Sequence, residues 1–133
     1  MSIDSDVVAE VHALHDDLAL WLGTPDAAEA LERFLGQQHP EFSMVTQTGS
    51  VVARVALTDG LRGAGNTSPG LGIDIREIEI LHRSADAVVV RFEEVHRHRG
   101  GARSRLTTAL LLADPQDRNG LRWRSVHETA SAN

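Results

Sequence analysis

The stretch "LGIDIREIEILHRSADAVVVRFEEVHRHRGG", residues 71–101, decides which kind of fold the chain can adopt. It contains two long runs in which apolar and polar residues alternate, and such alternation predicts half-buried β-strands. Only a short turn at residues 84–86 separates the runs, so the two strands are expected to pair antiparallel. Similar runs follow at residues 102–114 and 121–130 and extend the pattern to an antiparallel meander.

The apolar residues of the first run change sides partway along it. Ile73 and Ile75 have one parity, whereas Ile78 and Ile80 have the other. A β-bulge at residues 76–77 would return both pairs to one buried face and would bend the strand. Flat strands would also overhang, because about 12 residues span roughly 40 Å and a globule of this length has a radius of gyration of about 14 Å. We therefore expect a bent, wrapped sheet.

The first half of the chain predicts helices. Apolar residues recur every three or four positions in residues 5–22 and 25–38, which is the pattern of amphipathic helices. Residues 41–53 predict two short strands joined by a turn, and residues 54–65 predict a third, short helix. The expected class is α+β, with three N-terminal helices packed in a strongly curved, mostly antiparallel sheet.

Length and composition narrow the function classes. The 133 residues fit one domain at residues 1–133, with flexible ends at about residues 1–4 and 130–133. The chain has no cysteine, which excludes thiolate catalysis and cysteine-ligated metals. Its net charge of −6 argues against a nucleic-acid partner. No apolar run approaches the roughly 20 residues that span a bilayer, and the acidic start does not look like a signal peptide. We expect a cytoplasmic protein with no membrane partner.

Three segments carry a resemblance to a known group of proteins: "HPEFSMVTQTG" at residues 39–49, "VVVRFEEVHR" at residues 88–97 and "LRWRSVHET" at residues 121–129. With them the chain resembles the nuclear transport factor 2-like superfamily, specifically its SnoaL-like and ketosteroid isomerase-like bacterial branch. The resemblance implies a cystatin-like cone, in which a curved sheet wraps around the helices and a pocket opens at the wide end. It also implies a homodimer formed through the outer face of the sheet.

The resemblance does not choose an activity, because a fold alone does not determine function. The superfamily includes isomerases, cyclases, dehydratases, small-molecule binders and assembly domains. Its isomerases place a carboxylate base opposite a tyrosine, and this chain has no tyrosine. Its cyclases use a histidine–aspartate pair, which His15 with Asp16 or Asp17, or else His127, would have to supply.

Several candidate site residues lie on the predicted strand at residues 87–99. Phe92, Glu94, His96 and His98 share the side that begins apolar and becomes polar, so this side is expected to line the pocket from its core to its mouth. Glu94 is either a buried acid with a raised pKa or the partner of an arginine. The carboxylate and two imidazoles could also hold a metal, but the arginines between them disfavour a cation, and we expect no metal and no cofactor.

The closing strand offers a second set of candidates. Trp123, Ser125 and His127 share one side of residues 121–130, and we expect that side to be a pocket wall. His127 would then act as a general acid or base, since an imidazole titrates near neutral pH. The alternative is a structural histidine held by a backbone carbonyl or by Glu94.

The strand at residues 102–114 has leucines on both sides. We expect Thr108 and the leucines of its parity to face the pocket, which turns the opposite side outward. A sheet face that carries small apolar residues needs a cover, and a second copy of the chain would provide it. The expected dimer surface includes Thr107, Ala109, Leu111 and Val126.

Two surface segments complete the expected pocket. The arginine-rich hairpin tip at residues 97–103 is either a rim that attracts an anion or a solvated hairpin end. The glycine-rich segment at residues 63–72 follows a helix and precedes a strand, which is the reverse of a dinucleotide-binding motif. We expect it to be a mobile loop at the pocket mouth.

Three functions remain open at this point. The favoured one is a binder of a small, partly apolar molecule. The others are an isomerase, cyclase or lyase with a pocket His or Glu as general acid/base, and a dimerisation domain with a vestigial pocket. The expected ligand-binding residues are Trp21, Met44, Phe92, His96, Thr108, Trp123 and Ser125. The candidate catalytic residues are Glu94 and His127.

Overall fold

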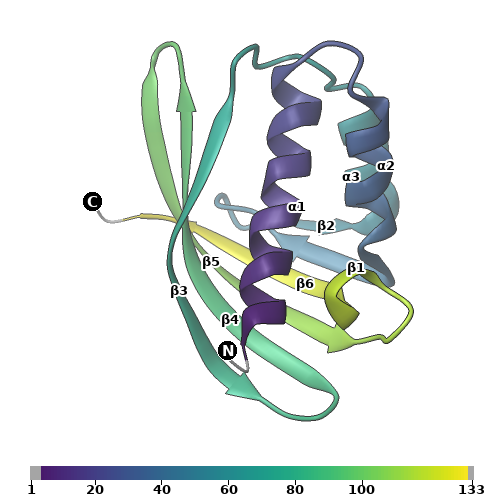
Figure 1. Cartoon of the computed structure of the whole chain (residues 1–133). Coiled ribbons are helices and arrows are strands. Elements are labelled where there is room, and N and C mark those ends of the chain that lie inside the picture. The colour runs from purple at the N-terminus through teal and green to yellow at the C-terminus, as the bar shows by residue number, and fades with distance from the viewer. Residues whose placement is uncertain (1–3, 132–133) are drawn as a thin grey trace.

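The computed structural model describes residues 4–131 and contains three α-helices beside a six-stranded sheet (Figure 1). The helices are α1 (Ser5–Gly23), α2 (Ala28–Gly36) and α3 (Arg54–Arg62), with a short 3₁₀ turn, η1 (Arg118–Gly120). The strands are β1 (Gln38–Val45), β2 (Val51–Ala53), β3 (Gly72–Arg83), β4 (Ala87–His98), β5 (Gly101–Ala113) and β6 (Leu121–Ala130). The α+β class expected from the sequence is confirmed.

The sheet has the strand order β2-β1-β6-β5-β4-β3. Its neighbours pair antiparallel except for β1 and β6, which run parallel. The long strands β3, β4 and β5 bend along their length, and the helices lie on the concave side of the sheet (Figure 1). The mostly antiparallel cone implied by the resemblance is therefore present.

The predicted bulge in β3 is confirmed. The pairing of β3 with β4 shifts register between Arg76 and Glu79, and Glu77 has a positive φ of 56°. The bulge turns both isoleucine pairs toward the helices, because Ile73 is buried and Ile75, Ile78 and Ile80 are partly buried against the core. An extra residue in one strand increases its local twist, and this is how the sheet edge curves around α1.

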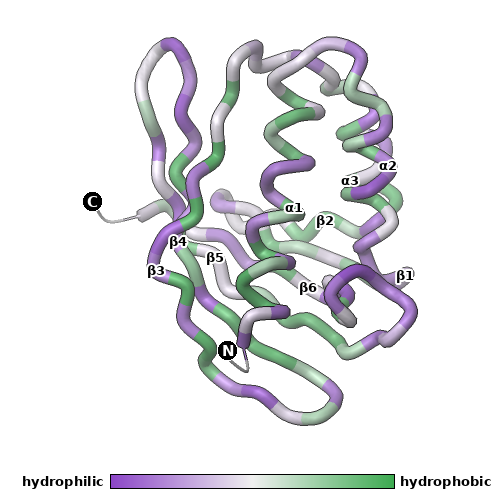
Figure 2. The backbone as a smooth tube through the Cα atoms, viewed as in Figure 1, coloured by the Kyte–Doolittle hydropathy of each residue, from purple (hydrophilic) through white to green (hydrophobic). Residues whose placement is uncertain are grey.

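The core lies between α1, α2 and the concave face of the sheet. The helices contribute Val7, Val11 and Phe34, and the sheet contributes Phe92 and Trp123, all of them buried. Figure 2 shows the corresponding alternation on α1, where hydrophobic and hydrophilic segments follow one another along the helix. This periodicity is the amphipathic pattern read from the sequence.

The register between β4 and β5 corrects the expected orientation of β5. Residues directly opposite each other in an antiparallel pair point to the same face. Thr107 lies opposite the buried Phe92, and Ala109 lies opposite the buried Val90, so both face the core. Thr108 is exposed on the outer face instead. The local pattern could not distinguish the two faces, because leucines occur at both parities of this strand.

The residues expected to form a dimer surface are therefore inside the protomer. Thr107, Ala109 and Leu111 are buried within the chain, and Val126 packs against the core from a partly buried position. The outer face of these strands carries Leu106 and Leu110 in their place. The prediction assigned these residues to the outer face and was wrong. In a strand, an error of one residue places every side chain on the opposite face.

The remaining elements differ from expectation mainly at their ends. The second helix begins at Ala28 rather than at Pro25, because Asp26 adopts a positive φ of 56° that a helix cannot accommodate. The flexible ends expected at residues 1–4 and 130–133 lie mostly outside the described residues, and Ala130 belongs to β6. Within residues 4–131, no helix is both long and apolar enough to cross a membrane.

Candidate functional site

A cavity of about 380 Å³ lies between the helices and the wide end of the sheet. Side chains from α1, α2, α3 and β1 form its apolar wall. These residues are Leu14, Leu18, Leu22, Phe34, Phe42, Met44, Leu57 and Leu61. Leu71, Trp123 and Val126 complete it. Since the wall is mostly hydrophobic, the cavity favours a ligand with an apolar body.

Glu94 is the most deeply placed charged group of the cavity, with only 2% of its surface exposed. Three side chains surround its carboxylate. Thr107 donates its hydroxyl hydrogen to Oε2 over 2.6 Å, and His96 Nε2 lies 2.9 Å from Oε1. His15 Nε2 lies 3.5 Å from Oε2. The carboxylate is thus held by groups from α1, β4 and β5 together.

His15 is the cationic partner of Glu94. Its Nδ1 lies 2.7 Å from the Val11 carbonyl oxygen, which can only accept a hydrogen bond, so Nδ1 carries a proton. The other ring nitrogen faces the Glu94 carboxylate, which favours a second proton there. His15 also makes edge-to-face contacts with Phe92 and Trp123, whose rings hold the imidazole in place.

The pKa values of this pair move in opposite directions. Burial alone would raise the pKa of Glu94, but the charge of His15 and the hydrogen bonds from His15, His96 and Thr107 outweigh it and hold the pKa well below its ordinary value. Burial alone would lower the pKa of His15, yet the charge of Glu94 outweighs it and raises the pKa. The pair is therefore an ion pair, not a protonated acid beside a neutral imidazole.

The sequence predicted Glu94 either as a buried acid with a raised pKa or as the partner of an arginine. Glu94 is buried, but its pKa is lowered and its charged partner is not an arginine. A histidine from α1, which is far away in the sequence, provides the positive charge. Arg105 lies directly opposite Glu94 in the sheet, but it pairs with Glu128 at 3.3 Å. Burial and the nearby charge of Glu94 raise the pKa of Glu128.

Of the expected pocket wall on β4, the structure places Glu94, His96 and His98 at the cavity, but not Phe92. Glu94 and His96 line the cavity together with Met44 and Trp123. Phe92 is fully buried beneath them and contacts both His15 and Trp123 edge-on. Exposure increases from Phe92 through His96 to His98 at the hairpin tip. This gradient matches the predicted passage from core to mouth.

The expected wall on β6 is corrected. The pairing of β5 with β6 shifts register between Leu110 and Leu111, whose partners are Ser125 and Trp123. The shift reverses the parity of β6 beyond Trp123, so that Ser125 and His127 leave the cavity side. His127 is exposed opposite Thr108 on the outer face, and none of Ser125, His127 and Thr108 lines the cavity. Glu94 and His127 therefore do not meet.

Val126 and Glu128 take the places on the cavity wall that the sequence analysis assigned to Ser125 and His127. A bulge of one residue causes this exchange, because it moves the following side chains of β6 to the opposite face. The proposed catalytic role of His127 loses its physical basis, since the imidazole is on the wrong side of the sheet.

The segment between α3 and β3 lies at the cavity, as predicted, through Ser68 and Leu71. It is tied to the end of α1 rather than free. The backbone N–H groups of Asn66, Ser68 and Gly70 donate to carbonyl oxygens of residues 21–23. Trp21 packs against this segment and donates to the Leu61 carbonyl, so it supports the wall without lining the cavity.

Sequence reasoning missed Thr107, Gln38 and Glu128 as cavity residues and placed His15 only as half of a possible cyclase pair. Gln38 is buried in the wall and donates to the Phe34 carbonyl, while its side-chain oxygen has no partner among residues 4–131. A signal was available for His15, because it follows Leu14 on the buried stripe of α1. A polar residue on such a stripe requires a buried partner.

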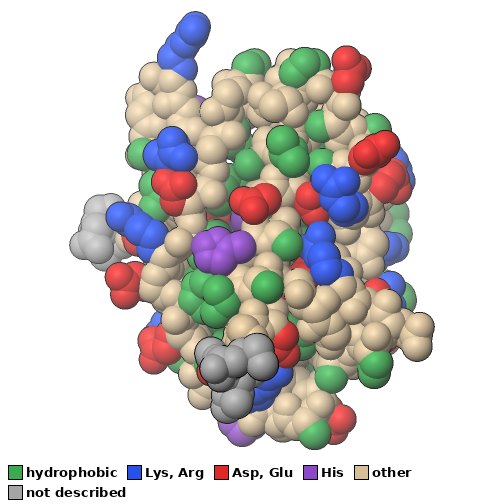
Figure 3. Space-filling view, viewed as in Figure 1, with side chains coloured by type: hydrophobic (Ala, Val, Ile, Leu, Met, Phe, Trp, Pro, Cys, Tyr) green, Lys and Arg blue, Asp and Glu red, His purple; other side chains and the backbone are tan. Residues whose placement is uncertain are grey.

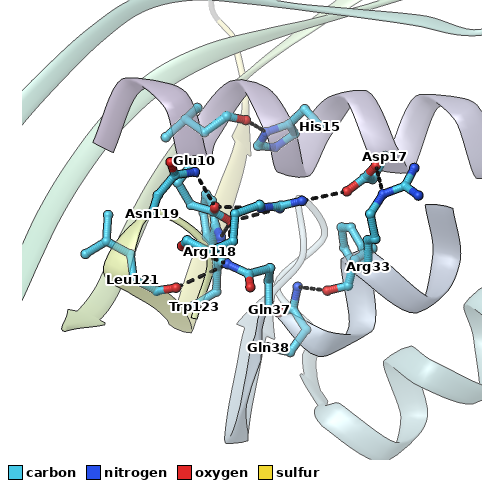
Figure 4. Close-up of polar contacts among 12 residues, drawn as sticks. Glu10, His15, Asp17, Arg33, Gln37, Gln38, Arg118, Asn119, Leu121 and Trp123 are labelled. Carbon is cyan, nitrogen blue, oxygen red and sulfur yellow. Dashed lines mark hydrogen bonds and ion pairs between the residues drawn. The ribbon is translucent and has the colours of Figure 1, made fainter. Parts of the chain in front are cut away.

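A second polar cluster lies beside the cavity, around the fully buried Glu10 (Figure 4). Arg118 makes two hydrogen bonds to the Glu10 carboxylate, of 3.0 and 3.1 Å, and one of 2.9 Å to Asp17. Gln37, Asn119 and Trp123 also donate to Glu10. The cluster joins α1, the residue after α2, η1 and β6, and it orients the Trp123 indole that forms part of the cavity wall.

No group of three or more histidine, aspartate or glutamate side chains in the described part of the chain is arranged to hold a metal ion. The histidines that first suggested a metal site are accounted for otherwise. His96 is bound to the Glu94 carboxylate, and the exposed His98 accepts a hydrogen bond from the Gly100 backbone at Nδ1.

Known proteins resemble this chain in structure more than in sequence. Neither a family model nor a curated protein matches its sequence. An NTF-2-like protein of unknown function from Pseudomonas aeruginosa is 31% identical, with a TM-score of 0.88 over 96% of this chain and 99% of that one.

Other solved structures share the fold at low identity. The CaMKII hub of S. rosetta has a TM-score of 0.74 at 13% identity and covers 98% of each chain. A protein with a cystatin-like fold from Caulobacter vibrioides has a TM-score of 0.69 at 15% identity over 95% of this chain and 87% of that one. The likeness to the Pseudomonas protein, in sequence and along nearly the whole of both chains, shows that this chain belongs to the nuclear transport factor 2-like superfamily.

Proposed function

We propose that the chain binds a small, partly apolar molecule in the cavity between the helices and the sheet. The observation that carries this proposal is the open volume of about 380 Å³, which the nearby rings of Trp21, Phe92 and Trp123 do not fill. Ligand sites commonly enclose roughly 300–1,000 Å³ and combine an apolar wall with a few polar groups. A vestigial pocket would have collapsed onto such large side chains, since protein interiors are close-packed.

The polar groups support binding better than proton transfer. Glu94 accepts from three side chains and has a lowered pKa, so it is a weak base at neutral pH. His15 has a raised pKa, and its Nδ1–H donates a hydrogen bond to the Val11 carbonyl. The two groups act as fixed charges that orient a ligand. The partnerless oxygen of Gln38 adds an acceptor that a ligand hydroxyl or N–H could satisfy.

The test uses the neutral fluorescent probe phenylnaphthylamine, whose emission rises in apolar surroundings. We expect the wild-type protein to bind it. Replacing Leu18 and Leu57 together by tryptophan places two large rings in the cavity from α1 and α3, and should weaken binding by more than about tenfold because the probe no longer fits. The measurement is a fluorescence titration at constant protein concentration.

The matched control carries the same two substitutions outside the cavity, at the exposed Leu20 and Leu81. This variant should bind the probe like the wild type. Circular dichroism would show that both variants are folded. Equal probe binding by the two double variants, or no binding by the wild type, would contradict the proposal. Native mass spectrometry of the purified protein would add the mass of a retained ligand.

We also propose that the chain forms a homodimer through the outer face of the sheet. The support is the uncovered face of β5 and β6, where Leu106 is 40% exposed beside Thr108 and His127. An apolar side chain on an open sheet face is stabilised when a second copy covers it. The cytoplasmic location stays a prediction from the sequence.

Light scattering at micromolar concentration tests this dimer. The wild type should have twice the mass of the chain, and Leu106→Glu should have the mass of a monomer because a charge cannot be buried at the interface. Val55→Glu is the control, since Val55 is 73% exposed on α3, away from the sheet face. A monomeric wild type, or a Leu106→Glu variant that stays dimeric, would rule this interface out.

A further inference from the structure

The charges of the cavity wall do not balance. Glu94 is paired with His15, and Glu128 is paired with Arg105. Arg103 lines the same cavity, but none of the ion pairs found in residues 4–131 involves it. The wall therefore has one more positive group than negative groups. The chain as a whole has the opposite sign, with a net charge of −6.

The register of the β4–β5 hairpin places this extra charge at the cavity mouth. Arg103 lies opposite His96, and Arg105 lies opposite Glu94, so both arginines are on the inner face of the hairpin. His98 is one step further toward the tip on the same face and also lines the cavity. Figure 3 shows that basic side chains project from this end of the hairpin.

His98 contributes a hydrogen-bond donor beside Arg103. The Gly100 backbone N–H donates to His98 Nδ1 over 3.2 Å, so the lone pair of this nitrogen accepts and the nitrogen carries no proton. In the neutral ring the proton must then be on Nε2. The mouth thus offers an unpaired guanidinium and an imidazole N–H, whereas the deeper cavity is walled by the leucines of α1 and α3.

Resting on the function proposed above, we propose that the ligand is an amphipathic monoanion, specifically a small organic acid. Its apolar body lies against Leu14, Leu18 and Leu57, and its carboxylate binds Arg103 and His98 at the mouth. Arginine suits this role because its planar guanidinium binds a carboxylate through two parallel hydrogen bonds. A positive site in an acidic protein also steers an anion to the mouth and leaves the outer surface unattractive to it.

Competition against bound phenylnaphthylamine tests this inference with two competitors of equal chain length, octanoate and octanol. Octanoate should displace the probe from the wild type at lower concentration than octanol. Arg103→Gln should weaken competition by octanoate about tenfold, the effect of losing one charge-assisted contact, and leave octanol unchanged. Added salt should weaken competition by octanoate and leave competition by octanol unchanged.

Arg99→Gln is the matched control, because Arg99 is exposed near the same hairpin tip and does not line the cavity. It should leave both competitors unchanged. Equal competition by octanoate and octanol in the wild type would overturn the inference while probe binding still upholds the proposed function. The inference would also be overturned if Arg103→Gln weakened competition by octanoate and by octanol to the same extent. The same holds if Arg99→Gln weakened competition by octanoate as much as Arg103→Gln does. Absence of probe binding in the wild type would overturn both proposals.

Discussion

Replacing Glu94 by glutamine is expected to lower the free energy of unfolding by about 3 kcal/mol, because removal of one partner of a buried ion pair leaves the other uncompensated. Glutamine has nearly the same shape and can still accept from Thr107. Glutamine carries no charge, however, and cannot balance the positive charge of His15, which is only 5% exposed. Urea unfolding of the wild type and the variant measures the difference.

The control for this prediction is Glu79→Gln. Glu79 also forms an ion pair, with Arg91 at 3.0 Å, but its side chain is 60% exposed. Exposed pairs contribute about 0–1 kcal/mol, so this variant should unfold much like the wild type. If Glu94→Gln costs no more than Glu79→Gln, then the pair with His15 is not a stabilising interaction.

The pH dependence of stability separates the charge from the shape of Glu94. Its pKa is lowered in the folded protein, so its contribution is present above the ordinary value of 4.5 and is lost as the pH falls toward the folded value. The pKa of His15 is raised, so its contribution is complete below the ordinary value of 6.5 and is lost as the pH rises through the folded value. These two groups together favour greatest stability between pH 4.5 and 6.5.

In Glu94→Gln, the free energy of unfolding should depend on pH with the opposite slope. Without the carboxylate, burial lowers the pKa of His15, and protonation of His15 then opposes folding. Stability should therefore fall as the pH drops below 6.5, where the wild type keeps its stability. Nuclear magnetic resonance titration of the His15 ring would report the change in its pKa directly. Parallel stability profiles for the two proteins would show that His15 and Glu94 are not coupled.

Replacing Arg118 by alanine is expected to cost about 3–4 kcal/mol, and hence roughly 10 °C in melting temperature, because Glu10 would remain buried without its positive partner. Glu10 is fully buried, and Arg118 provides two of the hydrogen bonds to its carboxylate. The neutral donors Gln37 and Trp123 remain, but they do not balance the charge. Thermal unfolding followed by circular dichroism measures the loss.

Arg33→Ala is the control, since Arg33 and Arg118 both pair with Asp17, but the Arg33 side chain is 49% exposed and does not reach Glu10. It should cost about 1 kcal/mol or less. Adding Glu10→Gln to Arg118→Ala should restore part of the stability by removing the unpaired charge. A double variant no more stable than Arg118→Ala would mean that packing, and not charge, explains the loss.

The class of fold could be predicted because its signals are local. The period of the helices, the alternation along β4 and the change of parity at the bulge in β3 each depend on a few neighbouring residues. The positions of Glu94 and His96 on the cavity wall followed from the same alternation, and the structure confirms them. The bulge could be predicted because the isoleucines on either side of it need to be buried together.

The rest of the site could not be predicted from single strands. The inner face of β5 was misassigned because its leucines occur at both parities, and only its pairing with β4 shows that Thr107 faces Glu94. The shift in β6 that removes His127 from the cavity was likewise missed, and it is seen in the register with β5. A one-residue change of register moves every following side chain to the other face at little cost to the backbone.

By itself, then, the sequence determined the elements, the curvature of the sheet and the strand that lines the cavity, because the burial of apolar residues repeats within each element. Only the tertiary structure decided which charges meet. His15 reaches Glu94 because α1 crosses the concave face of the sheet, and Arg118 reaches Glu10 because η1 closes over the same helix. These partners are far apart in the sequence, and a buried charge is paired by whichever group the fold brings beside it.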